Sequence, residues 1–158
     1  MDRHILEGII LVLVTVFIHG TGTLLFIWMM EAYRPFWERH SGIALNTMTL
    51  TWVVCSLILL HLLEIAVYAA FYRQMGILPD GETAAYFSLA TYTTVGYGDV
   101  VLPREWRIFG ASEALVGILM TAWSTVLLIT VVNATHTRTL EKIRTKLPWK
   151  KPDAPTSE

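Results

Sequence analysis

The hydrophobic residues of this chain gather in three long runs, at about 5–30, 48–72 and 108–136. An α-helix rises about 1.5 Å per residue, so each run is long enough to cross the hydrocarbon core of a bilayer, about 30 Å thick. The pattern predicts three transmembrane helices. The chain then divides into an N-terminal helix (1–31), a polar connector (32–47), a segment with the other two helices (48–137) and a tail (138–158).

A shorter helix is predicted between the second and third runs. Pro79-Asp80-Gly81-Glu82 is typical of a helix start, because Asp80 can cap the first turn and Glu82 lies favourably against the positive end of the helix dipole. The helix that follows, 82–92, would be only roughly 16 Å long. It cannot cross a membrane, so it must enter and return, with protein or a water-filled cavity covering its ends.

The composition agrees with a membrane protein. Hydrophobic residues make up 54% of the 158 residues and charged residues only 16%, whereas soluble domains carry about 25% charged residues. The single cysteine, Cys55, excludes an intrachain disulfide. The sequence contains no catalytic triad, metal cluster, cofactor motif or phosphate-binding loop, so we expect neither an enzyme nor a nucleic-acid partner.

The first apolar run has no convincing basic start or cleavage site, so we interpret it as an uncleaved helix and not as a signal peptide. It lacks the repeated Arg or Lys residues of a voltage sensor. His19 within it is expected to form an interhelical hydrogen bond, with proton sensing as the alternative.

The stretch Thr93-Thr94-Val95-Gly96-Tyr97-Gly98-Asp99 is too polar and too rich in glycine to span a bilayer. Glycines alternating with Val95 and Tyr97 allow a backbone whose successive carbonyls point the same way. A thread of carbonyl oxygens above the Thr94 hydroxyl can replace the water shell of a dehydrated potassium ion. A surface turn would explain Tyr97-Gly98-Asp99 alone, but not the whole run.

This stretch resembles the signature of the potassium channel pore-domain family. The resemblance implies an all-α membrane protein with an outer helix 48–72, a pore helix 82–92, a filter 93–99 and an inner helix 108–136. The N-terminal helix lies outside this core and resembles a peripheral helix of some small bacterial members. The family uses four filter loops around one pore, and this chain has one, so a homotetramer is implied.

The resemblance also implies the roles of the filter residues. Potassium ions would be coordinated by the carbonyls of Thr94, Val95, Gly96 and Tyr97 together with the Thr94 hydroxyl, and Gly98 completes the ion-binding stretch. The potassium ion is the only cofactor expected.

Other residues are predicted to support the filter: Thr93, Asp99, Tyr86, Phe87, Glu64 and Glu113. Tyr97 would pack against Tyr86 and Phe87. Glu64, one helical turn from His61, would support the filter from behind, with a functional His–Glu pair as the alternative. Some relatives pair the aspartate with a glutamate where this chain has Ala90, so Asp99 needs another partner, for which Arg104 and Arg107 are candidates.

The inner helix contains the gating candidates. Gly117 either marks a bend or allows close packing against the pore helix. Thr121, Thr125, Leu128 and Val132 share a helix face, which would line the cavity and form a dewetting gate, or else pack against another helix. The stimulus that opens the pore is not predicted: protons, membrane tension and lipid all stay open.

The tail after Thr137 is basic, so it should remain in the cytoplasm and could contact anionic lipid. Three spans then place the N-terminus and the filter mouth outside, in a multi-pass protein of a cell membrane, expected to be a bacterial inner membrane. The alternatives to a potassium channel are a non-selective cation channel and a non-conducting membrane sensor or subunit.

Overall fold

The computed structural model describes residues 2–39 and 42–146, and within these ranges all regular structure is helical. Three long helices, two short ones and one 3-10 turn follow in order: α1 (Asp2–Ala32), α2 (Arg34–Arg39), α3 (Ile43–Gln74), α4 (Gly81–Tyr92), η1 (Arg104–Trp106) and α5 (Arg107–Lys146). The all-α fold expected from the sequence is confirmed.

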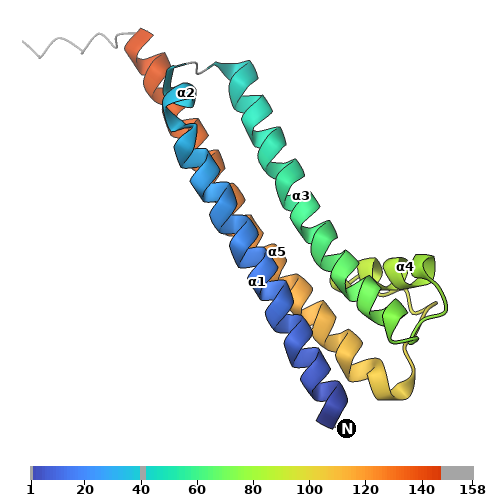
Figure 1. Cartoon of the computed structure of the whole chain (residues 1–158). Helices are drawn as coiled ribbons and strands as arrows, with labels where there is room; N and C mark the ends of the chain where they lie inside the picture. The colour runs from blue at the N-terminus through green and yellow to red at the C-terminus, as the bar shows by residue number, and fades with distance from the viewer. Residues whose placement is uncertain (1, 40–41, 147–158) are drawn as a thin grey trace, which may run out of the picture.

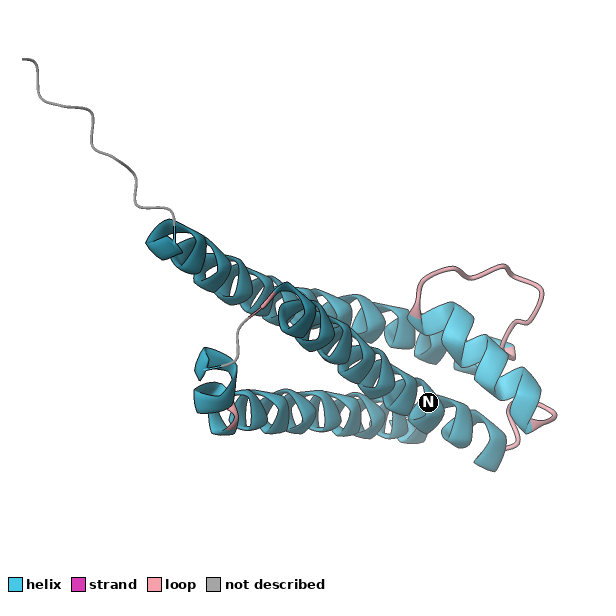
Figure 2. Ribbon diagram, turned by 90° about the horizontal axis from the view of Figure 1, so that it is seen from above, coloured by secondary structure: helices cyan, strands magenta, loops and turns pink. Residues whose placement is uncertain are grey.

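The long helices form elongated rods, and the short α4 lies beside one end of them (Figure 1). Helix α4 packs against both α3 and α5, and α1 packs against the same two helices. The start of α1 and the loop after α4 lie at the same end of the molecule, whereas α2 and the end of α5 lie at the other (Figure 1). Figure 2 shows the loop after α4 projecting beyond the helices.

The three spans predicted from the sequence are present as helices of sufficient length and hydropathy. They comprise Leu6–Ala32, Ala44–Gln74 and Arg104–Thr137. Only 28% to 33% of the residues in their most apolar windows are buried inside the chain. Most apolar side chains of the spans therefore face outward, as expected for a protein surrounded by lipid or by further copies of itself.

Aromatic packing fixes α4 against the spans that flank it. The rings of Phe71 in α3 and Phe109 in α5 stack with centroids 4.9 Å apart. Tyr72 of α3 contacts Phe87 of α4 edge-on at 5.3 Å, and Trp106 meets Phe109 at 5.7 Å. This cluster joins all three elements around the short helix.

A second apolar cluster lies nearer the opposite end of the molecule. Phe26 of α1, Val53 and Leu57 of α3 and Val131 of α5 are buried against one another. Helix α1 is therefore anchored to both helices of the segment 48–137, although it precedes them in the chain.

Some helix ends differ from the predicted ones. Helix α3 begins at Ile43 and not at 48, and α5 continues to Lys146 into the predicted tail. The side chain of Asn46 donates to the Thr139 hydroxyl at 2.8 Å, so polar groups on the two extensions satisfy each other. Hydropathy alone misses such extensions because it stops at the first polar residues. The remainder of the tail, 147–158, lies outside the described residues, and its contact with anionic lipid stays a prediction.

Candidate functional site

The site is built on the loop that leaves the C-terminal end of α4. Asp80 caps the start of the helix: its carboxylate accepts hydrogen bonds from the Thr83 backbone N–H at 2.8 Å and from the Thr83 hydroxyl at 2.9 Å. These bonds hold the pKa of Asp80 below its usual value, the backbone bond most strongly. The other end of α4 is the negative end of its dipole, which favours a cation beside the loop.

The loop backbone follows a regular alternation. Thr94, Gly96 and Gly98 have φ of 61°, 49° and 79°, whereas Val95 and Tyr97, which lie between them, do not have positive φ. Positive φ therefore recurs at every second residue from Thr94 to Gly98, in a region of φ that residues other than glycine rarely adopt. Thr94 is the only non-glycine residue with positive φ in the described chain. Holding a residue in that region costs about 1–3 kcal/mol, and such residues cluster at functional sites.

The side chains of this loop project away from the rest of the chain. Val95 is 51% exposed and Tyr97 74% exposed. The expected packing of Tyr97 against Phe87 is not seen within one chain, because Phe87 is buried in the core against Tyr72. Packing of Tyr97 against Tyr86 stays a prediction.

Asp99 finds a partner that the sequence analysis did not assign to it. The Tyr86 hydroxyl donates to Asp99 Oδ2 at 2.7 Å, and this bond lowers the pKa of the Asp99 carboxyl. The proposed partners Arg104 and Arg107 were wrong: Arg107 Nε instead donates to the Leu102 carbonyl at 3.3 Å. The sequence predicts both Tyr86 and Asp99 as supports of the filter, but their pairing depends on how the loop returns over α4.

A buried polar cluster lies behind the last residue of α4. Tyr92 donates its hydroxyl to Glu64 of α3, and His61 Nδ1 lies 3.0 Å from the same hydroxyl. His19 of α1 contributes Nδ1 at 2.8 Å from the other Glu64 oxygen. The expected interhelical hydrogen bond of His19 is confirmed, and Glu64 contacts α4 directly before Thr93. The sequence analysis missed Tyr92, although its position next to the filter was a usable signal.

Glu113 of α5 holds α4 from a second side. Its carboxyl oxygens lie 2.5 Å from the Ser88 hydroxyl and 2.6 Å from the Tyr72 hydroxyl. Glu113 and Ser88 are fully buried. A buried polar group is costly without partners, so these contacts tie α3, α4 and α5 together.

The gating candidates lie along α5. A Cβ added at Gly117 would lie 2.0 Å from the Tyr92 carbonyl oxygen, so this glycine allows the end of α4 to press against α5. Leu128 packs beside the second apolar cluster, as in the helix-packing alternative, whereas Thr121, Thr125 and Val132 are exposed in the single chain. The gate itself stays a prediction.

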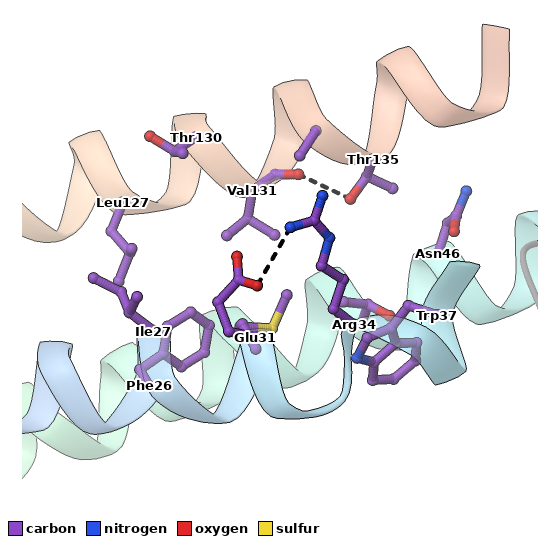
Figure 3. Close-up of a pocket in the computed structure, with 13 residues that line it drawn as sticks. Phe26, Ile27, Glu31, Arg34, Trp37, Asn46, Leu127, Thr130, Val131 and Thr135 are labelled. Atoms are coloured by element: carbon purple, nitrogen blue, oxygen red, sulfur yellow. Dashed lines mark hydrogen bonds and ion pairs between the residues drawn. The ribbon is translucent and has the colours of Figure 1, made fainter. Parts of the chain in front are cut away.

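A pocket of about 190 Å³ is drawn in Figure 3. The helices that line it place it at the end of the molecule opposite the loop (Figure 1). It is enclosed by α1, α2, the start of α3 and the later part of α5. Glu31 and Arg34 face each other across 3.5 Å, but both side chains are more than half exposed, so this ion pair contributes little to stability. The pocket is remote from the loop, and we assign no chemistry to it.

The amino-acid sequence matches one protein family and one known relative. Residues 47–134 match the protein family described as "Ion channel". A stretch of 67 residues is 42% identical to the "Voltage-gated potassium channel Kch" of Escherichia coli (strain K12). The match covers 40% of this chain and only 16% of that relative. No solved structure matches the chain.

Proposed function

The chain belongs to the ion channel family, and from that premise we propose that it is a potassium-selective channel. In this proposal K⁺ crosses the membrane passively through a filter made of four identical loops, each contributing residues 94–98. The relative from Escherichia coli, a potassium channel by name, supports this choice of ion.

The observation that carries the proposal is the alternating backbone of the loop. Positive φ at Thr94, Gly96 and Gly98 suits a strand whose carbonyls all face one axis. Rings of such carbonyls can replace the hydration shell of K⁺. Thr94 adds a hydroxyl at the end of the loop next to α4, and the C-terminal end of the α4 dipole favours a cation there.

The proposal requires four copies of the chain, because one loop cannot surround an ion. Two observations support assembly. The apolar side chain of Val95 and the ring of Tyr97 are left uncovered at the loop. One face of α5 is uncovered as well, with Thr121, Thr125 and Val132 exposed. In the proposed channel this face would line the pore below the filter.

The arrangement of the chain ends supports the proposed topology. The loop and the start of α1 lie together at one end of the molecule, and the basic end of α5 lies at the other (Figure 1). With the basic end in the cytoplasm, the filter opens to the exterior and the N-terminus is outside. We propose that the host membrane is a bacterial inner membrane.

The direct test is K⁺ flux into liposomes that contain only this protein, with Na⁺ replacement and Ba²⁺ block. We expect K⁺ flux that Ba²⁺ stops. Gly96→Ala should abolish it, because a side chain in the left-handed region costs about 1–2 kcal/mol and moves the carbonyls that face the ion.

Gly76→Ala is the matched control. Gly76 also has a positive φ, of 65°, with nothing within 4 Å of an added Cβ, but it lies between α3 and α4 and outside the loop. It should carry the same backbone strain and retain flux. Equal flux of Na⁺ would indicate the non-selective channel, and no flux from a correctly assembled tetramer would indicate the sensor or subunit.

A further inference from the structure

Two histidines and a glutamate meet inside the membrane-spanning part of the chain, where α1, α3 and α4 come together. His19 and Glu64 are fully buried, and His61 has 18% of its side chain exposed. Such residues within a span mark functional sites by default, because their burial is costly. The proposed conduction path uses the loop 94–98 and assigns no role to His19 or His61.

The potential ligand atoms of these three residues converge. His19 Nδ1 lies 2.8 Å from Glu64 Oε1, His61 Nδ1 lies 3.6 Å from Glu64 Oε2, and one ligand atom from each residue can be chosen so that all lie within 4.8 Å of one another. Around a tetrahedral Zn²⁺ with bonds of about 2.0–2.2 Å, neighbouring ligand atoms are about 3.4 Å apart. The two distances to the Glu64 carboxylate, 2.8 Å and 3.6 Å, lie on either side of that spacing.

We propose that His19, His61 and Glu64 bind a divalent transition-metal ion, for which Zn²⁺ is the natural probe. Two imidazoles and one carboxylate suit zinc and its neighbours in the first transition row, and do not suit Mg²⁺ or Ca²⁺, which prefer oxygen ligands alone. The Tyr92 hydroxyl, next to both His61 and Glu64, or a water molecule completes the four-coordinate site.

The surroundings of the cluster fit a cation. Metal-binding histidines commonly place their second ring nitrogen against a hydrogen-bond acceptor, and His19 Nε2 lies 3.4 Å from the Ser124 hydroxyl. When Nδ1 binds the metal, the ring proton resides on Nε2 beside that oxygen. Tyr92 is the last residue of α4, and its hydroxyl joins the end of this helix to the cluster.

The test measures binding and does not depend on conduction. The full chain in detergent is stripped with a chelator and titrated with Co²⁺, which absorbs visible light strongly when four-coordinate and weakly when six-coordinate. We expect one Co²⁺ per chain with the strong absorption, and its displacement by Zn²⁺. X-ray absorption at the zinc edge should then show two imidazoles per zinc. This measurement uses the unaltered protein, so it does not depend on the folding of a variant.

His61→Gln supplies the variant, because His61 is the least buried ligand and its loss disturbs packing least. Loss of a partner outside the ligand shell already costs about 10–100-fold in metal affinity, so we expect a loss of at least about 100-fold and disappearance of the absorption band. His136→Gln, at an exposed histidine of α5, is the control and should bind as the unaltered chain does.

Three results would overturn the proposal: no binding of one metal per chain, a six-coordinate spectrum, or binding that survives His61→Gln. Any of these would leave the cluster as a hydrogen-bonded contact between helices. Flux through metal-free protein would be unaffected by that outcome, so the potassium channel proposal stands or falls separately.

Discussion

At the residue scale, the loop combines Thr94, whose backbone is strained, with Asp99, whose carboxylate has a hydrogen-bond donor. Thr94 is β-branched and still has φ of 61°, a conformation that persists only where the surroundings impose it. Its N–H donates to the Thr91 carbonyl at 2.9 Å, and the Gly96 N–H donates to the Ala90 carbonyl at 3.1 Å. These bonds tie the start of the loop to the last turn of α4. At the far end of the loop, Asp99 is held by Tyr86.

The Tyr86–Asp99 bond leads to a prediction about pH. The bond lowers the pKa of Asp99 in the folded protein below its ordinary value of 3.8. Its stabilising effect is therefore fully present above that ordinary value and is lost as the pH falls through the lowered one. Tyr86→Phe removes the donor, so the Asp99 pKa should rise towards the ordinary value.

Carbon-13 NMR of the aspartate carboxyls during a pH titration measures this change. Asp80 provides an internal control, because its pKa is lowered by Thr83 and not by Tyr86. The Asp80 titration should be the same in both proteins. An Asp99 titration that does not change in Tyr86→Phe would show that the hydroxyl does not hold the carboxylate.

At the element scale, α4 is a short helix held on two sides. Glu64 of α3 meets Tyr92 at its end, and Glu113 of α5 meets Ser88 one turn earlier. Gly117 allows the closest approach, since its missing side chain leaves room for the Tyr92 carbonyl. The loop 93–99 starts from this fixed end, so the position of α4 sets the position of the candidate filter.

Gly117→Ala tests this packing. The added Cβ would lie 2.0 Å from the Tyr92 carbonyl oxygen, which is backbone and cannot rotate away. Overpacking of this kind costs about 1–3 kcal/mol, so we expect a lower midpoint of thermal unfolding in detergent. Gly20→Ala is the control, since its nearest neighbour would be Trp123 at 4.0 Å. If the two variants unfold at the same temperature, α4 does not press against α5 as described.

The elements could be predicted from the sequence, and most of their contacts could not. Hydropathy located three spans, and the capping residue Asp80 located α4 to within one residue. The contact of His19 with Glu64 joins residues 45 positions apart. It depends on the register of α1 against α3, which no local pattern sets. The sequence favours a charged partner for Asp99 because charge is visible in a sequence. The return of the loop over Tyr86 cannot be read from the sequence.

At the scale of the whole molecule, the single chain leaves much apolar surface uncovered. Its spans bury a minority of their residues. Its loop projects beyond the helices (Figure 2), and Tyr97 in this loop is 74% exposed. Tetramerisation around the loop would cover Val95 and Tyr97 and enclose the carbonyl side of the strand. The N-terminal helix α1 packs against both α3 and α5 and would remain outside the pore.

The reversal potential of the purified protein in a planar bilayer, with K⁺ on one side and Na⁺ on the other, tests the potassium channel proposal most directly. The potential depends only on the ions that pass and not on how often the pore opens. If the loop 94–98 selects K⁺, the current will reverse far from zero, in the direction of the K⁺ equilibrium potential. A reversal near zero would contradict the proposed selectivity, even in a protein that conducts.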